Sequence, residues 1–253
     1  MDAGEVLEVL HEVANVVRAS LHGLEDWSLA GTREGQYNSD LVADRAALEV
    51  IERAGFGAWS EESGVHDGHR PILVVLDPVD GSTNASRRLP WWATSACALD
   101  DEGPLAAVVA NQATGTRFEA TRGGGALRDG KPIHPSGCER MADAMVGFSG
   151  YPKLYLGWSQ YRSFGAAALD LCAVAEGALD GFVDCAAHPL APWDYLGGML
   201  VCEEAGAVVA EAEGLPLVVR DQGARRAPLA AGTPELLVEL RAARARLAQV
   251  TQP

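Results

Sequence analysis

The feature that most constrains the fold is a short apolar run that ends in two acidic residues. Residues Ile72–Leu76 are apolar without interruption and partly β-branched, which predicts a buried strand over 72–76. Asp77 and Pro78 end the run, and Asp80 and Gly81 follow in a turn. A tight turn can aim both carboxylates at one point, where they repel each other unless a cation lies between them. Hard oxygen ligands of this kind favour Mg²⁺, Mn²⁺ or Ca²⁺.

The residues after this turn are suited to binding a phosphate group. Ser82, Thr83 and Asn84 offer a helix N-cap and free backbone N–H groups. Taken alone, the segment fits an ordinary capped turn equally well. It is not an EF-hand loop, because the alternating Asp ligands and the Glu at position 12 are missing.

Two further acidic features strengthen the interpretation as a metal site. Glu61, Glu62 and Ser63 follow a short apolar segment, and Trp193 and Asp194 lie at the expected start of a helix. Adjacent acids usually mark a solvated loop, and an Asp in that position is usually an N-cap. Each feature is weak alone, but three in one chain point to a shared cation.

The rest of the chain alternates between helical and strand patterns, and its 253 residues suit one large domain or two small lobes. A polar loop is expected over 31–38, and two halves meet near residue 150. From spacing and turn residues we expect helices over 4–22, 44–54, 163–176, 193–205 and 234–247, and strands over 72–76, 93–99, 105–111, 181–183 and 207–210.

The charge balance excludes several classes of partner. Thirty-five acidic residues against 20 basic ones give a net charge of −15, so nucleic acid and anionic membranes should repel the chain. No apolar run is long enough to span a membrane, and the N-terminus lacks the positive region of a signal peptide. The five cysteines are odd in number and form no C-x-x-C pair, which favours a reducing cytoplasm over a disulfide framework.

The three acidic elements together resemble the inositol monophosphatase family of metal-dependent phosphatases. That family carries Glu-Glu-Ser, Asp-Pro-Ile/Val-Asp-Gly-Thr/Ser and Trp-Asp elements in this order, and the similarity here runs from Asp44 to Gly206. The resemblance implies an α/β (α+β) layered sandwich of alternating helices and sheets, with mixed or antiparallel sheets. Residues 1–150 would form a lobe with the metal and phosphate site. Residues 151–253 would contribute Asp194 and the substrate pocket.

The resemblance also implies a ligand set for two or three Mg²⁺ ions, with Mn²⁺ as a possible substitute. The first ion would bind Glu61, Asp77 and the carbonyl of Val79, and the second would bind Asp77, Asp80 and Asp194. A third, looser ion would use Glu61 and water. Glu61, and Ser82 paired with Asp44, would orient and deprotonate the attacking water. The segment around Asp44 is two residues shorter than the family pattern, so Asp40 is a rival for its role.

On the substrate side, the resemblance assigns backbone N–H groups of Gly81 and Ser82 to the phosphate. Gly165 and Ala167 would face the substrate. Asp184 stands where inositol-binding members have Glu, and the following segment to Pro192 is about three residues longer than the family pattern. His188 lies in this longer loop and is a candidate substrate contact.

The function implied is Mg²⁺-dependent hydrolysis of a small phosphate monoester by a metal-activated water, with inositol monophosphate favoured. Histidinol phosphate, fructose 1,6-bisphosphate and a 3′-phosphonucleotide are alternatives that keep the same chemistry. A catalytically silent metal-binding relative is an alternative of a different class. The resemblance further implies a cytoplasmic homodimer inhibited by lithium.

Overall fold

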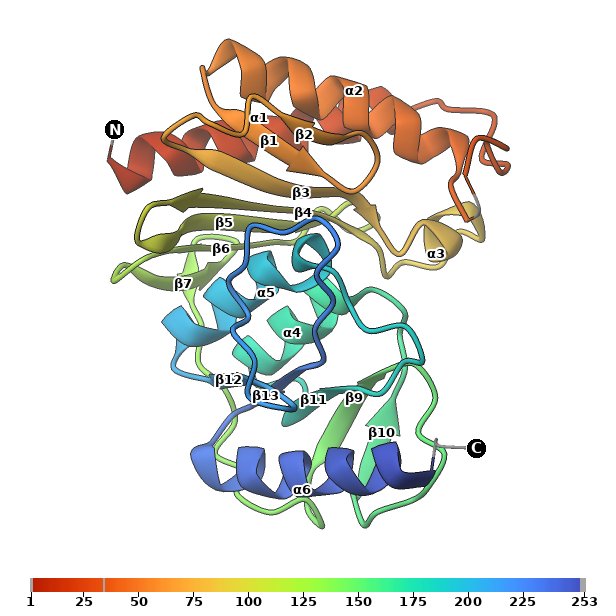
Figure 1. Cartoon of the computed structure of the whole chain (residues 1–253), viewed down its shortest axis with the longest axis vertical. Helices are drawn as coiled ribbons and strands as arrows, with labels where there is room; N and C mark the ends of the chain where they lie inside the picture. Colours follow the sequence, from red (N-terminus) through yellow and green to blue (C-terminus); the bar gives the residue numbers. More distant parts are fainter. Residues whose placement is uncertain (1, 34, 251–253) are drawn as a thin grey trace.

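The chain folds into five alternating layers of helices and sheets (Figure 1). The structure is a computed structural model that describes residues 2–33 and 35–250. The helices are α1 (Ala3–Leu21), α2 (Asn38–Arg53), α3 (Ser82–Ser86), α4 (Ala167–Ala175), α5 (Pro192–Ala205) and α6 (Pro234–Val250). The strands are β1 (Gly57–Ser60), β2 (Gly64–His66), β3 (Leu73–Asp80), β4 (Ala93–Asp100), β5 (Gly103–Asn111), β6 (Arg117–Thr121), β7 (Gly125–Arg128), β8 (Lys131–Pro132), β9 (Met145–Ser149), β10 (Gln160–Arg162), β11 (Gly181–Asp184), β12 (Val208–Glu211) and β13 (Pro228–Ala231).

Two mixed sheets form the β layers. The larger has the order β2-β1-β3-β4-β5-β6-β7-β8, and the smaller has the order β10-β9-β11-β13-β12. β1 pairs parallel with β3, whereas β3, β4 and β5 form an antiparallel meander. These features confirm the layered sandwich with mixed sheets.

Three apolar clusters hold the layers together. Helix α1 turns Val6, Leu10 and Val13 onto the larger sheet, beside α2, which confirms the amphipathic helix expected there. Helices α4 and α5 lie between the two sheets and are buried on most sides (Figure 1), as their nearly continuous apolar sequences require. Helix α6 covers the outer face of the smaller sheet through Leu236 and Leu240.

Helix α2 begins at Asn38, six residues before the expected start at residue 44. The carboxylate of Asp40 accepts the backbone N–H of Tyr37 at 2.8 Å, and this contact stabilises an earlier first turn. Helix α4 begins at Ala167 rather than residue 163, because Gly165 has a φ of +84°, which is incompatible with a helix.

Strand β3 extends to Asp80, so the expectation that Asp77 and Pro78 end it is wrong. The pairing with β4 shifts register between Asp77 and Asp80, and such a bulge keeps a strand in its sheet while it redirects side chains.

The division at residue 150 stays a prediction. Strand β9 belongs to the smaller sheet, so a boundary placed there leaves one strand of that sheet in the first lobe.

Within the described residues, no helix is both long and apolar enough to cross a membrane. All five cysteines are free thiols.

Candidate metal centre and active site

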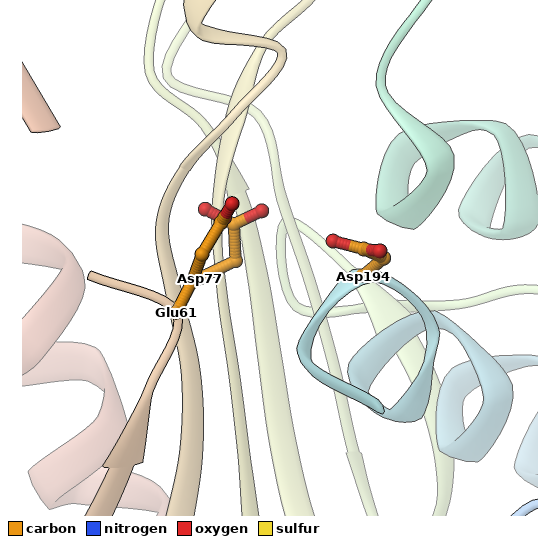
Figure 2. Close-up of side chains that lie close together, drawn as sticks. All are labelled: Glu61, Asp77 and Asp194. Carbon is orange, nitrogen blue, oxygen red and sulfur yellow. The ribbon is translucent and has the colours of Figure 1, made fainter. Parts of the chain in front are cut away.

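Three carboxylates from separate elements converge at one end of the larger sheet. Oxygen atoms of Glu61, Asp77 and Asp194 all lie within 4.8 Å of one another. Glu61 directly follows β1, Asp77 lies in β3, and Asp194 lies in the first turn of α5 (Figure 2). The parallel pairing of β1 with β3 continues past the end of β1, where the Glu61 N–H donates to the Leu76 carbonyl at 3.0 Å. Glu61 and Asp77 are thereby held side by side.

Backbone N–H groups orient three of the four predicted ligand carboxylates. Val79 donates to Asp77 Oδ1 at 2.9 Å, Ala168 donates to Asp80 Oδ2 at 2.8 Å, and Ala191 donates to Asp194 Oδ2 at 2.7 Å. The donor to Asp80 belongs to the first turn of α4, where N–H groups have no partner within the helix. Asp80 is therefore fixed between β3 and the helix layer.

Burial and mutual repulsion make this group of acids costly to ionise without a cation. Burial, followed by repulsion from Asp194, raises the pKa of Glu61 to about 8. Burial raises the pKa of Asp80 to about 8, and burial with repulsion from Asp80 raises that of Asp194 to about 7. The pKa of Asp77 is also raised well above its ordinary value, by burial and then by Glu61. A hard divalent cation would remove this repulsion, and the all-oxygen donor set fits Mg²⁺ or Mn²⁺.

Arg33 is a cation that the structure places beside Glu61 and Glu62, and sequence reasoning missed it. Its guanidinium donates to the Glu61 carbonyl and to the Glu62 carboxylate, each at 2.9 Å, and lies 3.6 Å from Glu61 Oε1. The loop before α2 therefore lies over the edge of the acidic group. No local pattern links a loop arginine to an acid 28 residues later, so the contact depends on the tertiary fold.

A cavity of about 210 Å³ adjoins the acids, and Asp80 and Asp194 form part of its lining. Gly165 and Ala167 also line it, so these two predicted substrate residues lie beside the predicted ligands. Gly81 has a φ of +86°, and a Cβ there would lie 3.0 Å from the Gly165 carbonyl, so the turn before α3 requires glycine.

Asp170 is a second residue that sequence reasoning missed. It lines the same cavity, accepts a hydrogen bond from Trp91 Nε1 at 2.8 Å, and has its pKa raised to about 8 by burial. The available signal was an isolated acid within the otherwise apolar helix segment 167–175.

The structure gives Asp44 a different partner from the one expected. The Ser60 hydroxyl donates to Asp44 Oδ1 at 2.5 Å, and among the described side chains no hydrogen bond joins Asp44 to Ser82. Asp44 thus holds the end of β1, one residue before Glu61. Asp40, the alternative to Asp44, accepts the Tyr37 N–H at the start of α2. The roles of Ser82 and Asp44 toward a nucleophile stay predictions.

Asp184 is the predicted substrate residue that lies apart. It is 0% exposed at the end of β11 and does not line the cavity beside the acids. Its Oδ1 accepts the Ala186 N–H at 3.1 Å, whereas Oδ2 is buried without a hydrogen-bond partner. Burial raises its pKa to about 6.

Comparison with known proteins places this arrangement in a family. The inositol monophosphatase family matches residues 6–246. The chain belongs to this family. Within it, the chain is 31% identical over 224 residues to a fructose-1,6-bisphosphatase/inositol-1-monophosphatase of Archaeoglobus fulgidus, covering 85% of this chain and 87% of that protein. It is 31% identical over 230 residues to the Nus factor SuhB of Escherichia coli K12, covering 84% and 82% respectively.

A solved structure of similar shape is that of the extragenic suppressor protein SuhB from Bartonella henselae. It superimposes with a TM-score of 0.80 at 27% identity, over 95% of this chain and 98% of that one. The shared fold therefore extends over nearly the whole chain.

Proposed function

We propose that this protein is a Mg²⁺-dependent phosphatase that hydrolyses small phosphate monoesters. The observation that carries the proposal is the convergence of Glu61, Asp77 and Asp194 from three elements, beside a cavity of small-molecule size. Inositol monophosphate is the substrate favoured by the family. Histidinol phosphate, fructose 1,6-bisphosphate and a 3′-phosphonucleotide remain alternatives.

In this proposal Glu61, Asp77 and the Val79 carbonyl would hold one ion, and Asp77, Asp80 and Asp194 would hold a second. Mg²⁺ held there would supply positive charge for the phosphate and a water molecule of lowered pKa. The backbone N–H groups of Gly81 and Ser82 contact the phosphate oxygens. Glu61 and the Ser82 hydroxyl orient the attacking water, and the Asp44–Ser60 hydrogen bond positions the strand end that carries Glu61.

The cavity lining constrains the alcohol part of the ester. Gly165 and Ala167 present little side-chain volume, which leaves room for a ring. The family resemblance assigns the hydroxyl groups of the alcohol to Asp184, whose carboxylate is fully buried and lies outside this cavity. The proposal also takes the protein to be a cytoplasmic homodimer inhibited by lithium, as in the family resemblance.

A second candidate function is that of a catalytically silent relative with a regulatory role. The observation that favours it is the similarity to a protein named a Nus factor. The retained carboxylates and the hydroxyl of Ser82 favour the enzyme.

The test is phosphate release with added Mg²⁺ from a panel of inositol, histidinol, sugar and nucleotide phosphates. Asp77→Asn should lose at least nine-tenths of kcat, because Asp77 would serve as a ligand in both proposed ion sites. Asp143→Asn removes an exposed carboxylate outside the site and should retain full activity. Turnover of no ester by the wild type would favour the silent relative. If Asp77→Asn retained more than a tenth of kcat, the ligand assignment would be wrong.

A further inference from the structure

Asn84 joins segments that lie far apart in the sequence. It is the third residue of α3. Its side-chain Nδ2 donates to the Trp91 carbonyl at 2.8 Å and to the Phe164 carbonyl at 2.7 Å. A side-chain amide has two N–H donors, so both are used. One side chain thereby ties α3 to the connection before β4 and to the segment that leads into α4.

These bonds lie where the phosphate turn, Gly81 and Ser82, meets the wall of the cavity beside the acids. A Cβ at Gly81 would lie 3.0 Å from the Gly165 carbonyl and 3.2 Å from the Trp91 carbonyl. A Cβ at Gly165, which lines the cavity, would lie 3.4 Å from Asn84 Nδ2. The turn proposed to bind phosphate therefore packs backbone against backbone on the cavity wall, with the Asn84 amide at the junction.

The phosphate turn has little local support of its own. Helix α3 has five residues, and its N-cap Gly81 makes no side-chain cap hydrogen bond. A helix this short is not stable without tertiary contacts. The Ala168 N–H holds Asp80 on one side of the turn. Among the described residues, Asn84 makes the only side-chain hydrogen bond between α3 and the segment before α4, so it holds the other side.

The two carbonyls that accept from Asn84 are held by contacts of their own. Trp91 Nε1 donates to Asp170 Oδ1 at 2.8 Å, and the ring centroids of Trp91 and Phe164 lie 4.7 Å apart. The carbonyl of Asn84 itself accepts the Leu89 N–H at 2.9 Å. Loss of the Asn84 amide should therefore loosen the phosphate turn and leave the cavity wall in place.

We infer that Asn84 is a positioning residue of the proposed phosphatase reaction. Its amide keeps the N–H groups of Gly81 and Ser82 at a fixed place relative to Gly165, so that the phosphate and the alcohol of one ester bind together. A small displacement of such a group removes much of its effect, because binding and reaction both need the correct geometry. The inference rests on the proposed function and adds to it a residue that acts through the phosphate turn.

The test is steady-state kinetics with Mg²⁺ on the ester of the panel that is hydrolysed fastest. Asn84→Ala should raise KM about tenfold and change kcat less than about twofold, because the lost hydrogen bonds position the phosphate in the ground state and the transition state alike. Asn84→Leu keeps a similar branched shape without donors and should raise KM to the same extent. A wild-type KM in either folded variant would overturn the inference.

Asn111 supplies the matched control. It is 4% exposed at the end of β5, and its Nδ2 donates to the Pro90 carbonyl at 3.2 Å, in the same connection before β4. Asn111→Ala removes a buried amide from this connection without touching the phosphate turn, so it should lower Tm and leave KM unchanged. If Asn111→Ala raised KM as much as Asn84→Ala does, loosening of the connection would explain both results and the inference would be wrong.

Calorimetric binding of inorganic phosphate in Mg²⁺ separates this inference from the proposed function. The wild type and Asn111→Ala should bind phosphate equally, and Asn84→Ala should bind it about tenfold more weakly. All three should bind Mg²⁺ alike, because other N–H groups hold Asp77, Asp80 and Asp194. If the wild type hydrolyses no ester but shows this pattern, only the proposed phosphatase activity fails. If it hydrolyses esters and Asn84→Ala binds phosphate as tightly as the wild type, only the role of Asn84 fails.

Discussion

Magnesium should stabilise this protein far more at alkaline than at acidic pH. In the metal-free chain the predicted ligands have raised pKa values, with that of Asp194 at about 7 and those of Glu61 and Asp80 at about 8. When the pKa of an acid is higher in the folded than in the unfolded chain, the acid stabilises the fold fully at pH values below its pKa in the unfolded chain, near pH 4. This stabilisation is lost as the pH rises toward and through its pKa in the folded chain. The metal-free chain should therefore lose stability between about pH 4 and pH 8.

The loss of stability in the metal-free chain can be estimated from Asp194 alone. For Asp194 the rise from 3.8 to about 7 corresponds to about 4 kcal/mol against ionisation in the folded, metal-free chain. A bound cation removes this cost, so its stabilising effect grows over the same pH window. For a chain of this length, about 4 kcal/mol corresponds to roughly 10 °C in Tm.

The assay is thermal unfolding at pH 5.5 and 8.5, in EDTA and in Mg²⁺. Between pH 5.5 and the folded pKa of about 7 only about 1.5 pH units of this cost remain, which is about 2 kcal/mol. The Tm difference between Mg²⁺ and EDTA should therefore be roughly 5 °C larger at pH 8.5, and Asp77→Asn should reduce this gain. Asp143→Asn is the control, because it removes an exposed carboxylate outside the site. It should leave the Mg²⁺ effect on Tm unchanged at both pH values. An equal Mg²⁺ effect at both pH values would refute the reasoning.

Three further predictions concern single side chains. In steady-state kinetics, Ser82→Ala should lower kcat more than it raises KM, and Ser82→Thr should stay active. A Ser82→Ala variant as active as the wild type would contradict the water-orienting role. Asp184→Asn should lower kcat/KM for histidinol phosphate about ten- to a hundredfold. It should lower kcat/KM for inositol monophosphate only mildly and leave that for an aryl phosphate unchanged. An identical profile for all three would mean that Asp184 does not face the substrate. Ser60→Ala should lower the free energy of unfolding by about 1–3 kcal/mol, because it leaves the buried Asp44 carboxylate without its donor, and an unchanged urea midpoint would contradict this.

Sequence patterns predicted the elements whose apolar residues form a clear pattern. Helix α1 follows from apolar residues at helical spacing, and β3 follows from an uninterrupted apolar run that is buried throughout. The short strands β9 and β10 were missed because they have only five and three residues, and none of the residues of β10 is buried. Helix α2 was placed too late because its start depends on a carboxylate contact rather than on apolar spacing.

The acidic residues themselves were predictable because each lies in a distinctive local motif. Which residues these acids contact in the fold was less predictable. Asp80 is directed by a β-bulge toward an N–H of α4, 88 residues later in the chain, and Asp44 bonds to Ser60 through the packing of α2 on β1. Arg33 and Asp170 carry no motif, so only the tertiary structure brings them to the site.

The contacts of the four predicted ligands divide them into two kinds. Asp77, Asp80 and Asp194 each accept a backbone N–H, and this fixes their orientation before any ion binds. Among the described residues, the Glu61 carboxylate has no such donor, and its nearest cation is the half-exposed Arg33. Glu61 is therefore the ligand with the most freedom to move. That freedom suits its proposed role, since the residue that both holds an ion and orients a water must adjust as the two arrive, while the three fixed carboxylates preserve the site.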